Sequence, residues 1–362
     1  MLGGGLLLLG PKAQFSRAAG SGTNLPGGAT PPANETMKIV RLSDTMIIAQ
    51  EDYFRVFALN TARGIVVIDT HFSLARMRAA KEMIEAEFKR QDYAFVINTH
   101  DHPEHMGGNA LFKPMIIVGQ EGMAEGQTQY QAKKSENVAA QIEQAIAKEA
   151  ETLAKLDKAT PAYGKSTEQI ARLRDSLETW NAGLVFPAIM FRDRLTLDLG
   201  DRTVILISCG KGGHSGSDSL VYIPEEKALL LGGACSAREL PPEIQAAGGT
   251  MDLARLISAL SEFADSDLEL KYIIPGHAPY LTKADLKFIR DYYRTLWQGF
   301  NQAKKDGLTL EQAKQRYSLG SGFGDFTALA KPTGKMIQRH DKNMDVLWAF
   351  LNQSTQERRA AP

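Results

Sequence analysis

The sequence predicts an α/β fold, because a strand, a helix and a second strand follow one another between residues 64 and 97. Residues 64–68 are a continuous apolar run rich in β-branched side chains, and residues 95–97 are a second apolar run. Between them, residues 73–90 repeat apolar side chains at helical spacing. Such short runs are typical of strands buried on both faces, and a helix joining two of them is a crossover connection. The pattern therefore favours a sheet covered by helices.

Further strands are indicated by short apolar runs that turn residues separate. They are expected at residues 40–49, 54–59, 115–118, 195–199, 204–208, 220–223, 228–231 and 272–274. The runs at 220–223 and 228–231 flank a short Pro-Glu-Glu-Lys segment, which predicts a hairpin.

Residues 120–185 differ in character and predict a helical hairpin inserted between strands. Residues 135–156 are rich in Ala, Glu, Lys and Gln and repeat apolar side chains every three or four positions. Ser166 with Gln169 forms a capping-box pattern that predicts the start of the second helix. The apolar stripe is expected to bury against the domain or a partner, which makes a homo-oligomer one interpretation. A cover over the active site is the sharper alternative.

The C-terminal part of the chain is expected to be helical. Residues 251–264 and 284–305 have apolar side chains at helical spacing. Thr309 with Gln312 predicts the capped start of another helix, and residues 346–351 form a last helical stripe.

The composition is that of an ordinary folded protein without net charge. The 362 residues include 42 Lys and Arg against 42 Asp and Glu, and 43% are hydrophobic. No nucleic-acid partner is expected, because such binding needs a basic surplus. Two cysteines are too few for a disulfide framework, and no apolar run reaches the roughly 20 residues of a membrane-spanning helix. The length alone favours two domains or one enlarged domain.

Residues 1–36 differ from the rest, because they are rich in Gly, Ala, Ser and Pro. The short apolar run at residues 6–9 and the small residues near position 18 fit an export signal, but the basic segment that normally precedes such a run is missing. An atypical signal and a flexible tail both remain open. The localisation therefore stays open between an exported, periplasmic protein and a cytoplasmic one.

Three of the seven histidines fall within six residues, directly after the predicted strand at 95–97. His100 and His102 are separated by one residue at a strand end, so both can point into one cavity. Glu104 and His105 follow without room for a helical turn and must face another direction. A loop with four potential ligands facing two ways suits two adjacent metal ions. A His-rich surface loop is the alternative.

Two other histidines also follow predicted strands, where a sheet would deliver them to a common edge. His214 lies in a Gly- and Ser-rich loop, and His277 lies in a Pro-Gly-His segment after the run at 272–274. His71 is expected to line the same rim without binding metal, and His340 is expected in solvent among charged residues. The joint arrangement favours a metal site over a surface loop.

These motifs resemble those of the metallo-β-lactamase fold superfamily of hydrolases. The resemblance lies in His100-Asp-His-Pro-Glu-His105, then Gly213-His214-Ser215, then Pro275-Gly276-His277, with Ile68-Asp69-Thr70 upstream. It covers about residues 38–281, and its motifs are specific in combination. It implies a four-layer αββα sandwich, with a catalytic domain at 37–281, a helical insertion at about 120–185 and a C-terminal helical extension at 282–362.

The resemblance also implies two sets of metal ligands. His100, His102 and His214 would hold one metal ion, and Glu104, His105 and His277 would hold the other. Asp69 would support the metal-binding loop or act as a further ligand.

The sequence departs from the family pattern at two positions. Glu104 stands where the family usually has Asp, so its side chain is one methylene longer. The carboxylate that often bridges the two metals would fall near Gly233, where this chain has none. Cys235 lies two residues further on and would be a ligand only if the loop bulges; it is expected to be unligated. Loss of the bridge favours one weak or absent metal.

The function implied is metal-dependent hydrolysis. Zinc is the default for a nitrogen-rich site, in one or two copies, and iron or manganese are alternatives. A zinc-bound hydroxide would attack an ester, thioester, lactone or amide bond of a small molecule, including a β-lactam, with Glu104 also handling a proton. A mononuclear iron dioxygenase of the same fold and a catalytically decayed metal-binding protein are the alternatives. The motifs do not identify substrate-binding residues, because loops rather than fold set the ligand.

Overall fold

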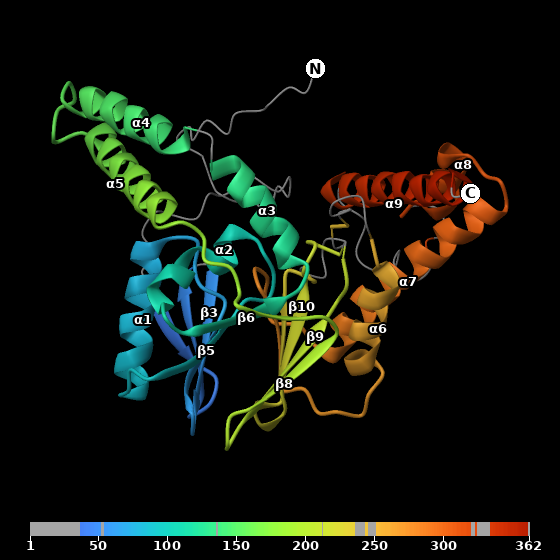
Figure 1. Ribbon diagram of the computed structural model, residues 1–362. Coiled ribbons are helices and arrows are strands. Elements are labelled where there is room, and N and C mark those ends of the chain that lie inside the picture. Colours follow the sequence, from blue (N-terminus) through green and yellow to red (C-terminus); the bar gives the residue numbers. More distant parts are fainter. Residues whose placement is uncertain are drawn as a thin grey trace.

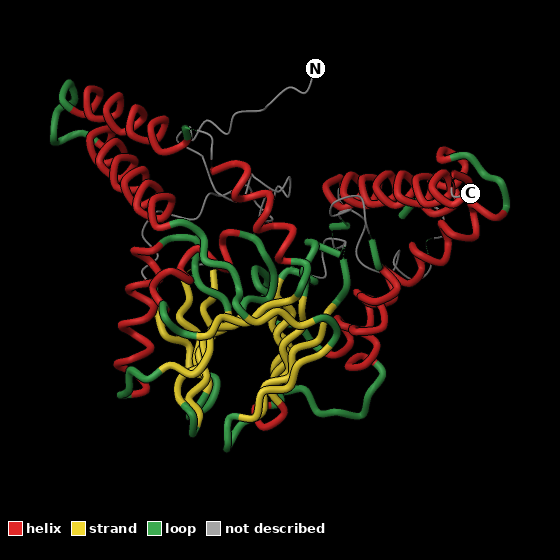
Figure 2. The backbone as a smooth tube through the Cα atoms, viewed as in Figure 1, coloured by secondary structure: helices red, strands yellow, loops and turns green. Residues whose placement is uncertain are grey.

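The computed structural model describes residues 37–51, 54–134, 137–211, 213–235, 243–244, 251–319, 323 and 334–360. The predictions made for residues 1–36 lie outside these ranges. The described residues form two β-sheets packed face to face, with helices on the outer side of each (Figures 1 and 2). This is the predicted four-layer αββα sandwich.

The first sheet has the order β1-β2-β3-β4-β5-β6-β7. Its strands are β1 (Lys38–Arg41), β2 (Met46–Glu51), β3 (Phe54–Thr61), β4 (Gly64–Ile68), β5 (Tyr93–Ile97), β6 (Ile116–Gln120) and β7 (Ile189–Phe191). Strands β1 to β4 are antiparallel, whereas β4 to β7 are parallel. Helix α1 (Leu74–Phe88) connects β4 to β5, which confirms the predicted crossover.

The second sheet has the order β12-β11-β10-β9-β8. Its strands are β8 (Arg194–Asp198), β9 (Thr203–Ser208), β10 (Ser219–Ile223), β11 (Ala228–Gly232) and β12 (Tyr272–Pro275). The pair β10 and β11 forms the predicted antiparallel hairpin around the short helix η3 (Pro224–Glu226). Strands β11 and β12 are parallel, and α6 (Leu253–Ala264) lies between them in the sequence.

The core has three layers of apolar side chains, because both sheets are covered on both faces. Strand β4 shows the alternation: Val66 and Ile68 are buried between the sheets, and Ile65 and Val67 are buried under α1. A third cluster lies between the second sheet and the C-terminal helices and includes Leu229. The continuous apolar run at 64–68 thus follows from burial on both faces.

Three helices follow β6: α3 (Met123–Lys134), α4 (Val138–Leu153) and α5 (Pro161–Ala182). Helices α4 and α5 pair as a hairpin that projects away from the sandwich (Figure 1). Ile142 of α4 and Ile170 of α5 are buried.

The single strand expected at residues 40–49 is wrong, because two strands occupy this stretch. Strand β1 ends at Arg41, and β2 begins at Met46 and runs antiparallel to it. Between them, the Ser43 hydroxyl accepts hydrogen bonds from the backbone N–H groups of Thr45 and Met46. A serine that hydrogen-bonds its own backbone in this way favours a turn over a continued strand.

The capping box expected at Ser166 and Gln169 is also wrong. Helix α5 begins at Pro161, with Thr160 as its N-cap accepting from the N–H of Tyr163. Proline favours the first helical position because its missing N–H is not needed there. Ser166 lies inside the helix, and its hydroxyl donates to Glu149 of α4 at 2.6 Å.

The C-terminal helices are α7 (Lys283–Lys305), α8 (Leu310–Tyr317) and α9 (Gly334–Ala360). The capping box at Thr309 and Gln312 is confirmed. The described helices include none that is long and apolar enough to cross a membrane.

The placement of His340 in solvent is wrong, because its side chain is completely buried between helices. Its Nε2–H donates to the carbonyl of Tyr317 at 2.8 Å, and its Nδ1 accepts from the Tyr292 hydroxyl at 3.1 Å. Asn343 donates in turn to the Tyr292 hydroxyl at 2.8 Å. Both imidazole nitrogens therefore have a protein partner.

Candidate metal centre

The six expected metal ligands come from loops of both sheets. His100 and His102 follow β5, and Glu104 and His105 lie on the short helix α2 (Pro103–Met106). His214 lies in the connection from β9 to β10, and His277 follows β12. Because the parallel strands of a sheet end at the same edge, the fold delivers these loops to one place.

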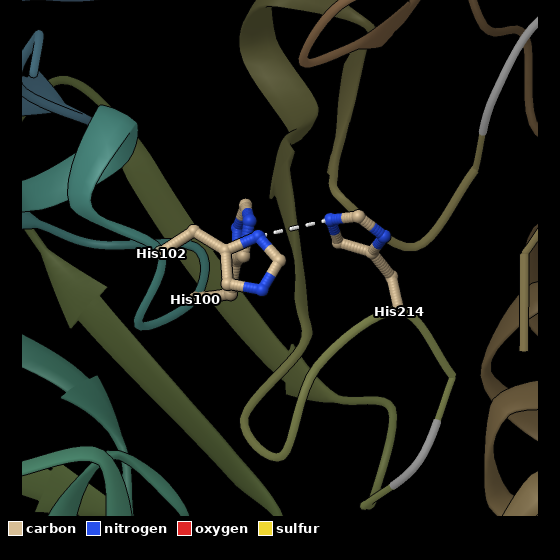
Figure 3. A group of neighbouring side chains, drawn as sticks. All are labelled: His100, His102 and His214. Atoms are coloured by element: carbon tan, nitrogen blue, oxygen red, sulfur yellow. Dashed lines mark hydrogen bonds between the residues drawn. The ribbon is translucent and has the colours of Figure 1, made fainter. Parts of the chain in front are cut away.

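The first group consists of His100, His102 and His214 (Figure 3). One ligand atom of each residue lies within 4.8 Å of the others. The Nε2 atom of His214 is 3.1 Å from Nδ1 of His102. The rings of His100 and His102 lie edge to face, with centroids 4.6 Å apart. Three imidazole nitrogens thus converge on one point.

The second group consists of Glu104, His105 and His277, whose ligand atoms also lie within 4.8 Å of one another. The Nε2 atoms of His105 and His277 are 2.8 Å apart. The two groups adjoin, because the ring centroids of His100 and His105 are 4.1 Å apart. Glu104 also lies near the first group, since its Oε1 is 3.9 Å from Nδ1 of His102.

Asp69 supports one histidine of each group. Its carboxylate accepts from the N–H and the hydroxyl of Thr99, each at 2.8 Å, and from Nδ1–H of His105 at 2.8 Å. Because the Thr99 hydroxyl donates to Asp69, it accepts from Nδ1–H of His100 at 3.0 Å. Nδ1 of each ring is therefore the donor to its support, and Nε2 is the candidate ligand atom. Asp69 itself lies behind these rings in an αL backbone conformation, φ 60°.

The charges of the site follow from burial and from Asp69. Burial lowers the pKa of His100 and of His214 well below the ordinary value, so both imidazoles are neutral. Burial also opposes a charge on His105, but the Asp69 carboxylate outweighs it and raises the His105 pKa. Burial would raise the pKa of Glu104, yet the neighbouring histidines, His102 first, hold it below its usual value.

The residues fit a pair of divalent cations. Nε2 of His100 is buried and has no hydrogen-bond partner, which is costly unless an electron-pair acceptor binds there. Tetrahedral zinc with Zn–N bonds of about 2.0–2.1 Å holds its nitrogens about 3.3 Å apart. The observed nitrogen separations of 3.1 Å in the first group and 2.8 Å in the second are close to that spacing.

Gly233 borders the first group, although it offers no ligand. A Cβ atom at this position would lie 2.2 Å from Cδ2 of His214 and 3.0 Å from Nε2 of His100. The glycine thus lets the two rings approach the backbone. Cys235 is buried, which raises the pKa of its thiol, and it belongs to neither ligand group among the described residues.

Two supports of the first group were missed by the sequence reasoning. The buried Asp218 carboxylate accepts from the backbone N–H groups of His214 and Ser215, each at 2.7 Å. The Ser217 hydroxyl donates to Asp101 at 2.8 Å, which ties the His214 loop to the His100 loop. The signal for Asp218 was a single acidic residue closing a Gly- and Ser-rich loop, a common hydrogen-bonding position.

Helix α3 packs on the loops of the first group. A Cβ atom at Gly126 would lie 2.2 Å from Oδ2 of Asp101, and one at Gly122 would lie 2.0 Å from the carbonyl of Gly216. The approach to the Gly216 backbone requires glycine at position 122, directly before α3, whereas the Asp101 side chain could move away from a larger residue at position 126. Within residues 120–185, α3 and the turn before it thus contact these loops.

His71, expected at the rim, is buried and belongs to neither ligand group. Its Nδ1 accepts from the N–H of Ser73 at 3.4 Å. Its ring contacts those of Phe54 and Phe72, with centroids 5.1 and 4.4 Å away. Burial lowers its pKa to about 3, so the side chain is neutral.

Comparison with known proteins places this geometry in a family. A family model described as "Metallo-beta-lactamase superfamily" matches residues 56–277. A stereoselective inverting sec-alkylsulfatase from Pseudomonas sp. matches with a TM-score of 0.52 at 14% identity, over 86% of this chain and 50% of that one. A metallo-beta-lactamase family protein from Thermus thermophilus gives a TM-score of 0.49 at 16% identity, over 87% and 91%. At such identities the likeness concerns the fold.

A shorter match involves a curated protein, 2,4-dinitroanisole O-demethylase subunit alpha from Nocardioides sp. (strain JS1661). It is 33% identical over 61 residues, which are 17% of this chain and 19% of that protein. The family model, by contrast, spans more than half of this chain and extends to His277, the last residue of the second ligand group. The chain therefore belongs to the metallo-beta-lactamase superfamily, whose members are generally metallo-hydrolases.

Proposed function

We propose that the protein is a binuclear zinc hydrolase that acts on an ester, thioester, lactone or amide bond of a small molecule. The observation that carries the proposal is the pair of adjoining ligand groups, one with three imidazoles and one with a carboxylate and two imidazoles. A nitrogen-rich set with one carboxylate suits zinc. Bound zinc lowers the pKa of a coordinated water to about 7 and so supplies a nucleophile at neutral pH.

The protein groups around this chemistry have distinct roles in the proposal. His100, His102 and His214 hold the first cation, and Glu104, His105 and His277 hold the second. Asp69 fixes the tautomers of His100 and His105. Glu104 borders both groups, so its carboxylate is placed to accept a proton from the attacking water.

Metal analysis combined with a hydrolase substrate panel tests this function. The wild-type protein is expected to bind two zinc ions and to hydrolyse at least one ester, thioester, lactone or amide. The double variant His102→Ala/His214→Ala is expected to lose the first zinc and all hydrolysis. Full activity of this variant without metal would contradict the proposal.

A redox enzyme is the second candidate, favoured by the short match to an O-demethylase subunit. Iron analysis and oxygen consumption separate the two candidates. One iron per chain with oxygen-dependent turnover supports the redox enzyme, and two zinc ions with oxygen-independent hydrolysis support the hydrolase. Two bound metals without turnover on either panel indicate a decayed catalytic site.

Self-association through the residues at 120–185 stays a prediction. The apolar stripe of α4 is only partly covered within the chain, since Ile142 is buried whereas Val138 and Leu153 keep part of their surface. Light scattering of the full chain and of a Val138→Glu/Leu153→Glu variant measures whether this stripe joins two copies.

A further inference from the structure

We propose that Arg55 is a positioning residue for His277 and thereby sets the affinity of the second ligand group for its metal ion. The inference rests on the proposed use of Glu104, His105 and His277 as metal ligands. Arg55 lies on β3 in the first sheet, far in sequence from the loop that it holds.

The Arg55 side chain bridges the backbone on both sides of His277. Its guanidinium is buried, and Nη1 donates to the carbonyls of Pro275 and Ala278, each at 2.7 Å. These carbonyls flank the Gly276-His277 pair. Hydrogen bonds from a charged donor are stronger than those from a neutral donor. One guanidinium nitrogen of Arg55 therefore holds the backbone on both sides of this short segment.

The residue next to Arg55 contacts the His277 ring itself. Phe54 lies edge to face against it, with centroids 5.5 Å apart. On the other side, the N–H of Gly276 donates to the carbonyl of Gly232 at 2.8 Å. The first two residues of β3 thus hold His277 in two ways: Arg55 bonds its flanking backbone, and Phe54 packs against its ring. Nε2 of His277 lies next to Nε2 of His105.

Other residues hold the loops of the first group. His214 of the first group is held by Asp218, and the His100 loop is held by Asp69 and by Ser217. The two carbonyls that accept from Arg55 flank His277, which belongs to the second group. A change at Arg55 is therefore expected to act on one metal ion and leave the other in place.

Burial of a guanidinium is costly, and an apolar side chain of similar volume often stabilises a fold as well or better. One accepting carbonyl belongs to Pro275, the last residue of β12, and the other to Ala278 in the loop that follows. The buried Arg55 guanidinium thus fixes the positions of two backbone carbonyls next to His277. Supporting groups of this kind typically change metal affinity by about 10- to 100-fold when they are removed.

Zinc titration of the metal-free full chain tests the inference by measuring the two binding events separately. Arg55→Met is expected to weaken the second event by about 10- to 100-fold and to leave the first unchanged. Arg55→Lys is expected to weaken it less, because both carbonyls accept from one nitrogen that an ammonium can replace. Arg290→Met is the matched control: Arg290 is equally buried, but it pairs with Asp265 and Asp291.

Two results would overturn the inference: unchanged second-zinc affinity in Arg55→Met, or an equal loss in Arg290→Met. If Arg55→Met does not fold, Arg55→Gln decides, and an unchanged second event in that variant overturns the inference as well. A wild-type protein that binds fewer than two zinc ions overturns this inference together with the proposed binuclear site. A wild type that binds two zinc ions without hydrolysing any substrate contradicts the function alone, and the Arg55 comparison is still decided by the titration.

Discussion

His100 at the candidate metal centre and His340 among the C-terminal helices are both completely buried, and burial lowers the pKa of each. They differ in their hydrogen bonds. Both ring nitrogens of His340 are paired, with the Tyr292 hydroxyl and the Tyr317 carbonyl. In His100 only Nδ1 is paired, with Thr99, and Nε2 has no partner.

This difference separates a structural histidine from a candidate ligand. A buried imidazole whose two nitrogens are satisfied contributes to stability, whereas one with an unpaired Nε2 costs free energy until a cation binds. Sequence context pointed the other way for His340, whose neighbours include Arg339 and Asp341. The pairing of the nitrogens thus distinguishes His340 from His100, but it does not by itself mark a ligand, because Nε2 of the buried His71 also has no hydrogen-bond partner and His71 belongs to neither ligand group.

Replacement of each histidine is expected to give opposite results, and this is the largest effect. His100→Ala is expected to abolish binding of the first zinc and hydrolysis. His340→Leu is expected to keep both zinc ions but to lower the free energy of unfolding by about 1–3 kcal/mol, because it leaves the Tyr317 carbonyl unpaired. Metal analysis and denaturant unfolding measure the two outcomes. Loss of metal in both variants would remove the distinction.

Glu104→Gln sharpens the comparison by removing charge from the second group while keeping the shape of the side chain. Turnover is expected to fall by about 10²- to 10⁴-fold if the carboxylate accepts a proton in the reaction. Glu104→Asp, which restores the residue usual in the family, is the control and is expected to keep more activity. Steady-state kinetics at saturating zinc measures both, and a wild-type rate in Glu104→Gln would exclude this role.

Asp69→Asn tests the support shared by the two groups. The amide has one oxygen and cannot accept from all three donors as the carboxylate does, so the Thr99 and His105 side chains, and through Thr99 that of His100, are held less firmly. Zinc affinity is expected to fall by about 10- to 100-fold at both groups. Zinc titration checks this: a loss confined to one group would show that Asp69 supports only that group.

The smallest expected effect is the pH dependence of stability that comes from His340. Its pKa is lowered on folding, so below about pH 6.5 the unfolded chain binds the extra proton. The stability contributed by neutral His340 is present above that pH and is lost as the pH falls toward the folded pKa. Metal-free wild type is expected to lose more stability than His340→Leu between pH 7.5 and 5.5, with a difference in slope below about 1.4 kcal/mol per pH unit. Equal slopes in urea unfolding would contradict this.

A sheet covered by helices could be predicted because its signals are local, whereas the four-layer sandwich and the two ligand sets were implied by the resemblance to the metallo-β-lactamase superfamily. The apolar run at 64–68 and the motif around His100 each lie within one strand and its following loop. Strand β7, only three residues long, has too short an apolar run to be distinguished from a loop. The start of α5 was misplaced because a capping pattern at Ser166 lies inside a helix that Thr160 and Pro161 begin.

The supports of the site could not be predicted, because each depends on residues distant in sequence. Arg55 and the Pro275 carbonyl are 220 positions apart, and no local pattern marks such a pair. His340 is buried because α9 packs against α7, which brings it to Tyr292. Long-range packing of this kind overrides the polar character of the neighbouring residues.

Neither sheet carries a complete set of ligands. The first sheet supplies two residues of each group, and the second sheet supplies His214 to one group and His277 to the other. A cation bound in either group is therefore a crosslink between the two halves of the sandwich. The unfolded chain does not hold these residues together, so metal would bind the folded state alone. The free energy of unfolding is therefore expected to rise with the concentration of free metal.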